Sequence, residues 1–61
     1  MPYNLTKREM DVAAMAAKGM SNKEIASKLF ISESTVRFHL RTVFSKMGID
    51  RRSKLPGLLK D

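Results

Sequence analysis

Two arginines stand four residues apart in the middle of the chain, with a phenylalanine between them. If the segment is helical, Arg37 and Arg41 lie one turn apart and Phe38 lies beside them. Guanidinium groups in this arrangement can donate to guanine edges or to phosphate oxygens, and the ring can contact a thymine methyl group. Ordinary surface arginines beside a ring that packs elsewhere would have the same spacing. This face by itself therefore leaves both interpretations open.

The spacing of the apolar residues predicts the helix that would carry this face. Its stripe consists of Val36, Leu40, Val43, Phe44 and Met47, a match to the 3.6-residue period. We expect a helix from Glu33 to Met47, ended by Gly48. The side opposite the stripe carries Ser34, Arg37, Phe38, Arg41, Thr42 and Ser45. The pattern thus predicts a helix with a packed back and a basic front.

Two capping signals predict helices before this one. Thr6 to Glu9 and Ser21 to Glu24 both have the S/T-x-x-E form of a capping box. They predict helices over residues 7–18 and 22–29, and Gly19 is the expected stop of the first. The inward stripe of the first helix is expected to be Val12, Met15, Ala16 and Met20.

A three-residue connection, Phe30-Ile31-Ser32, joins the second helix to the third, and we expect Ile31 and Ser32 to end the second helix. The C-terminal segment predicts a short fourth helix that Ser53 can cap, although Pro56 suits only its first turn.

We expect an all-α fold, a compact bundle of three helices plus a short fourth helix, containing a helix-turn-helix. At 61 residues, one domain is expected, over residues 4–60.

Composition narrows the possible functions. The chain has twelve Lys and Arg, six Asp and Glu, one His and no Cys, for a net charge of +6. Residues 32–54 hold six basic and two acidic side chains, a net +4, so the charge gathers around the predicted third helix. This excess favours a polyanionic partner.

We expect no metal, no cofactor and no enzymatic activity, because no group of ligands or catalytic residues is present. Without a signal peptide or a membrane-length apolar stretch, we expect a cytoplasmic protein, associated with the nucleoid when bound to DNA.

Helix N-termini and basic side chains supply the candidate DNA-binding residues. A short capped helix, a three-residue turn and a longer basic helix is the arrangement that places a second helix in the major groove. Free amides and the helix dipole favour anions at the two helix starts after Ser21 and Ser32. The candidate phosphate-binding residues are Ser21, Asn22, Lys23, Ser32, Thr35, His39, Lys46, Arg51 and Arg52. The candidate base-reading residues are Ser34, Arg37, Phe38 and Arg41.

The order and spacing of these motifs resemble the DNA-binding domain of the LuxR/FixJ/NarL (GerE-like) transcription regulators. The likeness covers about residues 4–59 and rests on Leu5-Thr6, Arg8-Glu9, Gly19, Ser21 to Ala26, Leu29, Ile31 to Glu33, Thr35 to Arg37, His39, Lys46 to Ile49 and Arg52. It implies a four-helix domain whose third helix reads the major groove of double-stranded DNA. In that family, base-contacting residues stand at the positions of Arg37, Phe38 and Arg41. Backbone contacts or their supports stand at those of Asn22, Lys23, Thr35 and Lys46.

The resemblance also implies partners. Members usually bind inverted half-sites as homodimers through the fourth helix, here residues 53–60. They often carry a regulatory domain N-terminal to the DNA-binding domain. Pro56 and Gly57 weaken a helix there, which argues against that dimer. Because no regulatory domain is present, we expect an excised effector domain or a small stand-alone regulator.

Two alternatives remain at this point. The capped helices and the Thr-Val pair also resemble the promoter-recognition region of a bacterial sigma factor. From a different class, a protein-interaction module could use Phe38 and the leucines of residues 55–59 as an exposed apolar surface.

Overall fold

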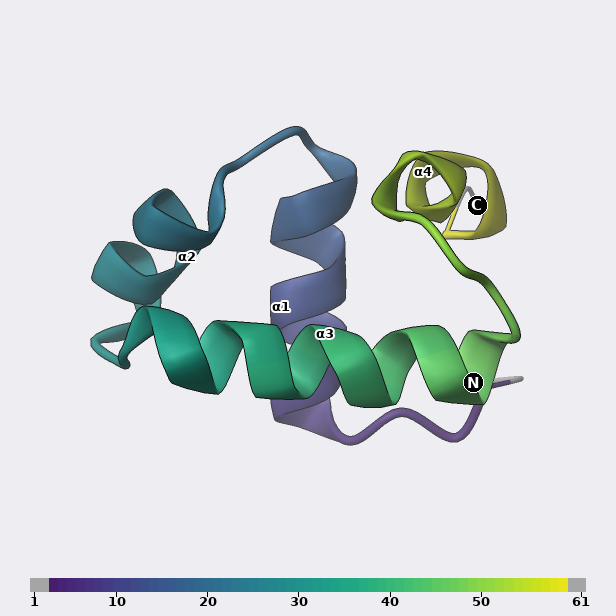
Figure 1. Cartoon of the computed structure of the whole chain (residues 1–61), viewed down its shortest axis with the longest axis horizontal. Coiled ribbons are helices and arrows are strands. Elements are labelled where there is room, and N and C mark those ends of the chain that lie inside the picture. The colour runs from purple at the N-terminus through teal and green to yellow at the C-terminus, as the bar shows by residue number, and fades with distance from the viewer. Residues whose placement is uncertain (1–2, 60–61) are drawn as a thin grey trace.

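The computed structural model describes residues 3–59, which form helices joined by short loops (Figure 1). The α-helices are α1 (Lys7–Ala17), α2 (Asn22–Leu29), α3 (Glu33–Met47) and α4 (Leu55–Leu58), and a 3-10 turn, η1 (Arg52–Lys54), precedes α4. No strand occurs within residues 3–59. The predicted all-α class is confirmed, and residue 60 of the predicted domain and dimer segments lies outside the described residues.

The predicted caps form as the sequence indicates. Thr6 Oγ1 accepts from the Glu9 amide at 3.1 Å, and Glu9 Oε1 accepts from the Thr6 amide at 2.9 Å. Ser21 and Glu24 repeat the same pair at 3.1 and 2.8 Å. The predicted bounds of α2 and α3 are confirmed, whereas α1 ends one residue earlier than predicted, at Ala17.

The first three helices end in the same way, at a residue with left-handed backbone. Gly19, Phe30 and Gly48 have φ of +91°, +58° and +69°. The next amide in each case donates to the carbonyl five residues back, the longer bond of a Schellman motif, as Ile31 does to the Ala26 oxygen at 3.0 Å. The two glycine stops are confirmed. The expected stop of α2 at Ile31 and Ser32 was wrong, because the backbone reverses at Phe30.

We predict that Phe30→Gly stabilises the fold. A Cβ in the left-handed conformation costs about 1–2 kcal/mol, and the extra freedom of glycine in the unfolded chain cancels part of that gain, so about 1 kcal/mol or less should remain. Phe30 is 94% exposed, so little packing is lost. Urea unfolding measures the change, with Phe30→Ala as control because alanine keeps the backbone strain. Equal stabilisation by both changes would contradict the backbone explanation.

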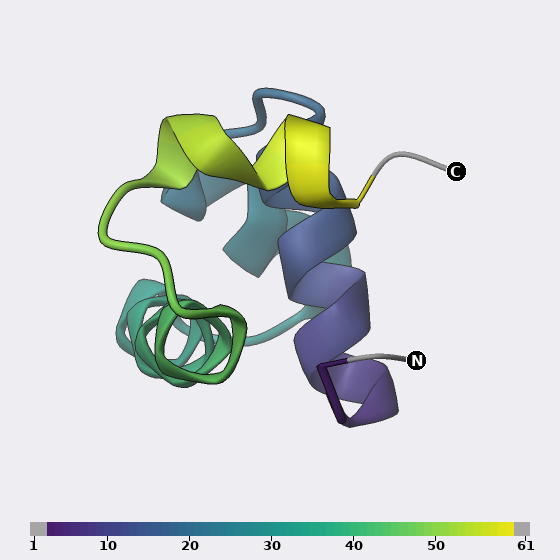
Figure 2. The same ribbon diagram turned by 90° about the vertical axis from the view of Figure 1, so that its right-hand side faces the viewer.

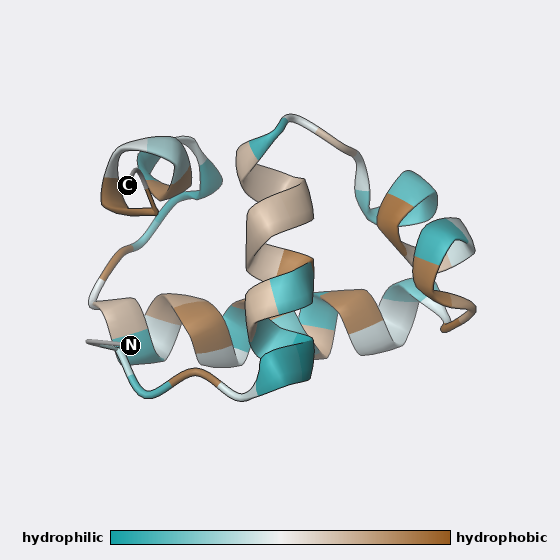
Figure 3. Ribbon diagram, turned by 180° about the vertical axis from the view of Figure 1, so that it is seen from behind, coloured by the Kyte–Doolittle hydropathy of each residue, from teal (hydrophilic) through white to brown (hydrophobic). Residues whose placement is uncertain are grey.

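The core lies where α1 crosses α3, with α2 and α4 closing its sides (Figures 1 and 2). Its largest fully buried side chains are Val12, Ile25, Val36, Val43 and Leu55. Seen from behind, the first turn of α1 is hydrophilic and its later turns are more apolar (Figure 3). Among the helices of residues 3–59, none combines the length and apolar character needed to cross a membrane.

The predicted inward stripe of α1 is partly confirmed. Val12 and Ala16 are buried, but Met15 and Met20 are only half-buried at its edge. Ala13, which was not expected in the stripe, is fully buried, and the carboxylate residue Glu9 is buried as well. The small side chains of α1 let the neighbouring helices approach it closely.

The C-terminal segment differs from its prediction at its start. Within residues 3–59 Ser53 does not cap a helix, because η1 begins one residue earlier, at Arg52, and neither η1 nor α4 has a side-chain cap. Pro56 does lie in the first turn of α4, as predicted. Leu55 is fully buried against α1, with α4 lying across the later turns of that helix (Figure 2).

Candidate nucleic-acid interface

The basic face of α3 is exposed, and its apolar back is in the core. Arg37 and Arg41 are exposed, and Phe38 has 59% of its surface free. Arg37 Nη2 donates to Ser34 Oγ at 3.2 Å, which links two of the predicted base-reading residues. The residues Val36, Leu40, Val43 and Met47 of the predicted stripe are buried, and Leu40 lies at the edge of the stripe next to Arg37 and Arg41. The core therefore holds α3 with this face outward.

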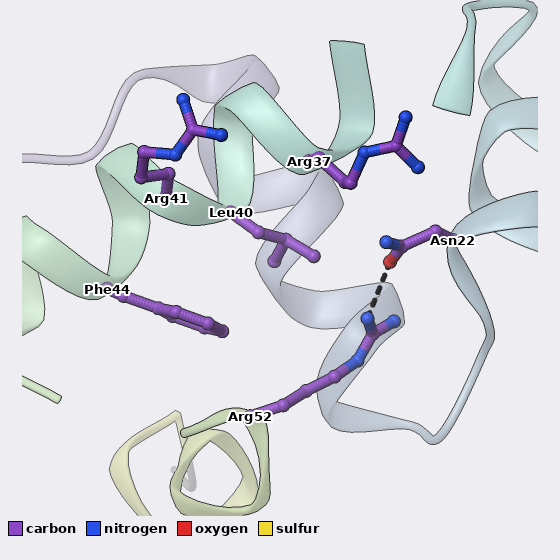
Figure 4. A pocket seen from close by; sticks show the side chains of 6 residues that line it. All are labelled: Asn22, Arg37, Leu40, Arg41, Phe44 and Arg52. Atoms are coloured by element: carbon purple, nitrogen blue, oxygen red, sulfur yellow. Dashed lines mark hydrogen bonds between the residues drawn. The ribbon is translucent and has the colours of Figure 1, made fainter. Parts of the chain in front are cut away.

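A groove of about 330 Å³ runs beside this face, between α3, the start of α2 and η1. Its lining residues are Asn22, Arg37, Leu40, Arg41, Phe44 and Arg52. Leu40 and Phe44 point into the space, while the guanidinium groups of Arg37 and Arg41 extend outward (Figure 4). Three arginines around an apolar floor make the groove attractive to an anion that also has an apolar part. Within residues 3–59, no group of ligands suited to a metal ion occurs.

The structure brings together two predicted phosphate-binding residues that lie 30 positions apart. Arg52 donates through Nη1 to Asn22 Oδ1, and it also donates through Nη2 to the Met20 carbonyl. Asn22 is the first residue of α2, and Lys23 beside it is exposed. The start of α2 is thus joined to η1 at the edge of the groove.

Lys46, another predicted phosphate-binding residue, lies away from the groove. Nine residues at about 100° each separate it from Arg37, which places the two half a turn apart around α3. Its Nζ lies 2.7 Å from Glu9 Oε1 and donates to the Asn4 carbonyl at 3.2 Å. Lys46 therefore joins the end of α3 to the start of α1.

The remaining predicted phosphate-binding residues occupy separate places. Ser32 caps α3 by accepting from the Thr35 amide at 3.1 Å, and the two hydroxyl oxygens lie 2.9 Å apart. Arg51 is exposed beside Asp50, with 3.5 Å between Nε and Oδ1. His39 is half-buried with its ring edge-on to Phe38, and its Nδ1 has no hydrogen-bond partner among the described residues.

From the sequence, Leu40 and Phe44 were expected in the core alone, and the groove was not predicted. A signal was available, because Phe44 follows Arg37 by seven residues and Arg41 by three, so the three share one side of α3. The partners of Arg52 and Lys46 had no such local signal. Both arise from contacts between segments far apart in the sequence.

The bond from Lys46 lowers the pKa of the Glu9 carboxyl from its ordinary value of 4.5, and the Thr6 amide lowers it further. The Ser21 amide similarly lowers the pKa of Glu24. A carboxyl with a lowered folded pKa contributes stability above its ordinary pKa. That contribution is lost as the pH falls through the folded value.

We therefore predict that the fold loses stability as the pH falls below about 4.5, and that Glu9→Gln reduces this loss. Glutamine still accepts from the Thr6 amide, so the change removes only the charge that faces Lys46. The variant should be less stable than the parent at pH 6, with the two curves converging in acid. Urea midpoints from pH 6 to pH 2 measure this, with Glu33→Gln as the exposed control. Parallel curves for the parent and Glu9→Gln would contradict it.

The sequence is similar to those of known bacterial regulatory proteins. Residues 3–56 match the family described as bacterial regulatory proteins, luxR family. The chain is 48% identical over 52 residues to an uncharacterised transcriptional regulatory protein of Bacillus subtilis, covering 85% of this chain and 24% of that protein. It is 50% identical over 48 residues to the nitrate/nitrite response regulator NarP of Escherichia coli, covering 79% of this chain and 22% of that protein. A nitrate/nitrite response regulator homologue of Haemophilus influenzae is 49% identical over 49 residues, 80% of this chain and 24% of that protein. The chain thus spans about a quarter of the length of these relatives.

Proposed function

This chain belongs to the luxR family of bacterial regulatory proteins and is a DNA-binding domain that acts in transcription regulation, and we propose that its α3 docks in the major groove of duplex DNA. The supporting observation is the orientation of α3, whose arginines face outward while its apolar stripe is buried. A helix-turn-helix uses its second helix in this way, and α2 and α3 with their short turn supply the unit.

In this arrangement the two classes of contact come from different elements. Arg37 and Arg41 donate to base edges, with Phe38 against thymine methyl groups and Ser34 at the end of α3 nearest the turn. The start of α2 meets the phosphates, since its free amides and Lys23 favour an anion. Ser21, Ser32 and Thr35 stand at the two helix starts, and His39 and Arg51 complete the predicted contacts to the backbone. Lys46 supports the interface from behind through Glu9.

The function of the whole protein follows as a further proposal. The relatives are about four times longer than the matched segment, so this domain would supply DNA binding to a longer bacterial regulator that acts in the cytoplasm. A homodimer on DNA through residues 53–60 stays a prediction. Leu58 is 39% exposed and available for such a contact, whereas Leu55 is committed to the core.

We predict that binding to duplex DNA weakens steeply with salt. Each phosphate neutralised by a basic side chain releases counterions, so log K should fall with log salt concentration by about 0.9 per phosphate. Titration of a labelled duplex, chosen by selection from a random pool, measures the slope. The spacing of half-sites in the selected pool also reports dimer geometry. A slope near zero would contradict DNA binding.

The interaction-module alternative has its own outcome in the same samples. Chemical shifts of Phe38 and Leu58 that move with a protein partner at high salt, and do not move with duplex DNA, would favour that alternative. For a DNA-binding face, we expect that at high salt the shifts move neither with a protein partner nor with duplex DNA.

A further inference from the structure

We propose, on the basis of the proposed DNA binding, that Arg52 is a positioning residue that turns the Asn22 carboxamide so that its Nδ2 faces a DNA phosphate. Arg52 reaches from η1 to the start of α2. Its Nη1 lies 2.5 Å from Asn22 Oδ1 and its Nη2 lies 2.5 Å from the Met20 carbonyl oxygen. The two acceptors flank Ser21, the N-cap of α2. One planar group therefore holds both sides of this helix start.

The chemistry of the two side chains determines which way the amide points. A guanidinium group has five donors and no acceptor, so the Asn22 atom that faces it must be the oxygen. The other end of the carboxamide, a two-hydrogen donor, then points away from Arg52. Figure 4 shows this nitrogen turned toward the groove side of α2. A donor fixed in this direction suits a phosphate oxygen that approaches between α2 and α3.

The backbone at the start of α2 depends on the second bond. Gly19 has left-handed backbone, and a side chain placed there would meet nothing within 4 Å. The loop before α2 is therefore lightly packed at Gly19, and the bond from Arg52 to the Met20 carbonyl restrains it. The Ser21 hydroxyl already holds the Glu24 amide, which leaves the Asn22 and Lys23 amides as the free donors of this helix start.

The burial of Arg52 distinguishes positioning from a direct ionic contact. Arg52 is half-buried with two of its nitrogens bonded inward, whereas its neighbour Arg51 is exposed. The two residues carry the same charge in the same segment. They therefore form a matched pair, in which substitutions remove equal charge but only one of them releases the start of α2.

The test compares Arg52→Lys and Arg52→Gln with Arg51→Lys and Arg51→Gln on the selected duplex. Lysine keeps the charge but cannot reproduce the planar fork that binds two acceptors. We expect Arg52→Lys and Arg52→Gln each to weaken binding about tenfold, the effect of losing one hydrogen bond to a charged group. Their salt slopes should equal that of the parent. Arg51→Gln, in contrast, should reduce the salt slope by about 0.9, as the loss of one phosphate contact does, and Arg51→Lys should stay within about threefold of the parent. Circular dichroism at the binding temperature ensures that only folded protein is compared.

A second variant removes the other partner. Asn22→Ala should weaken binding by a similar factor, and the Arg52→Gln/Asn22→Ala double variant should be no weaker than either single one, because both act through the same donor. Multiplying losses would overturn the inference. So would a salt slope reduced by about 0.9 in Arg52→Gln with binding retained in Arg52→Lys, which marks a direct phosphate contact.

The proposed function and this inference fail in different ways. If the parent chain bound no duplex, the proposed function would be overturned and the inference with it. If the parent chain bound the duplex and the Arg52 variants behaved as the Arg51 variants do, only the inference would be overturned.

Discussion

Replacing Arg37 with alanine is expected to relax base preference at one position of the binding site and to weaken binding to the preferred duplex between about five- and a hundredfold. Arg37 is exposed on the free face of α3, and among residues 3–59 its guanidinium group bonds only to Ser34 Oγ, a contact that leaves other donors available. A bidentate contact with a guanine edge would be lost in the variant. Random duplex should be affected much less, because it offers phosphates but no matched base.

Lys23→Ala provides the matched comparison for Arg37→Ala. Lys23 is an exposed cation at the start of α2, so its loss should weaken preferred and random duplexes by similar factors and reduce the salt slope by about one unit. Binding selections repeated with each variant measure both effects. If the two variants had the same effect on preferred and random DNA, α3 would not be the element that reads the sequence.

Replacing Leu55 with alanine is expected to remove a large part of the stability of the fold. Leu55 is completely buried, and truncating a buried leucine costs about 2–5 kcal/mol. A domain of this size has roughly 3–9 kcal/mol in total. The variant should therefore be partly or wholly unfolded near room temperature, although Leu55 belongs to the shortest of the described α-helices. Urea unfolding followed by circular dichroism measures the loss.

Leu58 is the control for Leu55, because it lies in the same short helix but is 39% exposed. Leu58→Ala should cost about 1 kcal/mol or less, since truncation there leaves no sealed cavity. Equal losses at the two positions would show that α4 stabilises the fold through its helical conformation and not through the burial of Leu55.

The helices could be predicted closely because their signals are local. Each cap joins residues three positions apart, and apolar residues recur about once per turn along the stripe of α3. Phe30 is the exception among the helix ends. Leu29 and Ile31 on either side of it both pack against the core, so the residue between them is turned outward into the left-handed conformation. Tertiary packing there overrode a local preference for glycine.

The candidate site was predicted only in part, because long basic side chains have two possible destinations. In the sequence, Lys46 and Arg52 were equivalent to the other cations and were assigned to phosphates. The structure gives them partners inside the chain, at 37 and 30 residues' separation. A flexible side chain can reach solvent or a neighbour, and only the packing of α1, α2 and η1 decides which acceptor lies within reach.

By itself the sequence determined the helical class, the bounds of α2 and α3, and the Arg37-Phe38-Arg41 face, because these follow from spacing along a single helix. Tertiary structure alone decided the groove, the intrachain contacts of Lys46 and Arg52, and the burial of Leu55. Those features need segments that only the fold brings together, and no local period encodes which ones will meet.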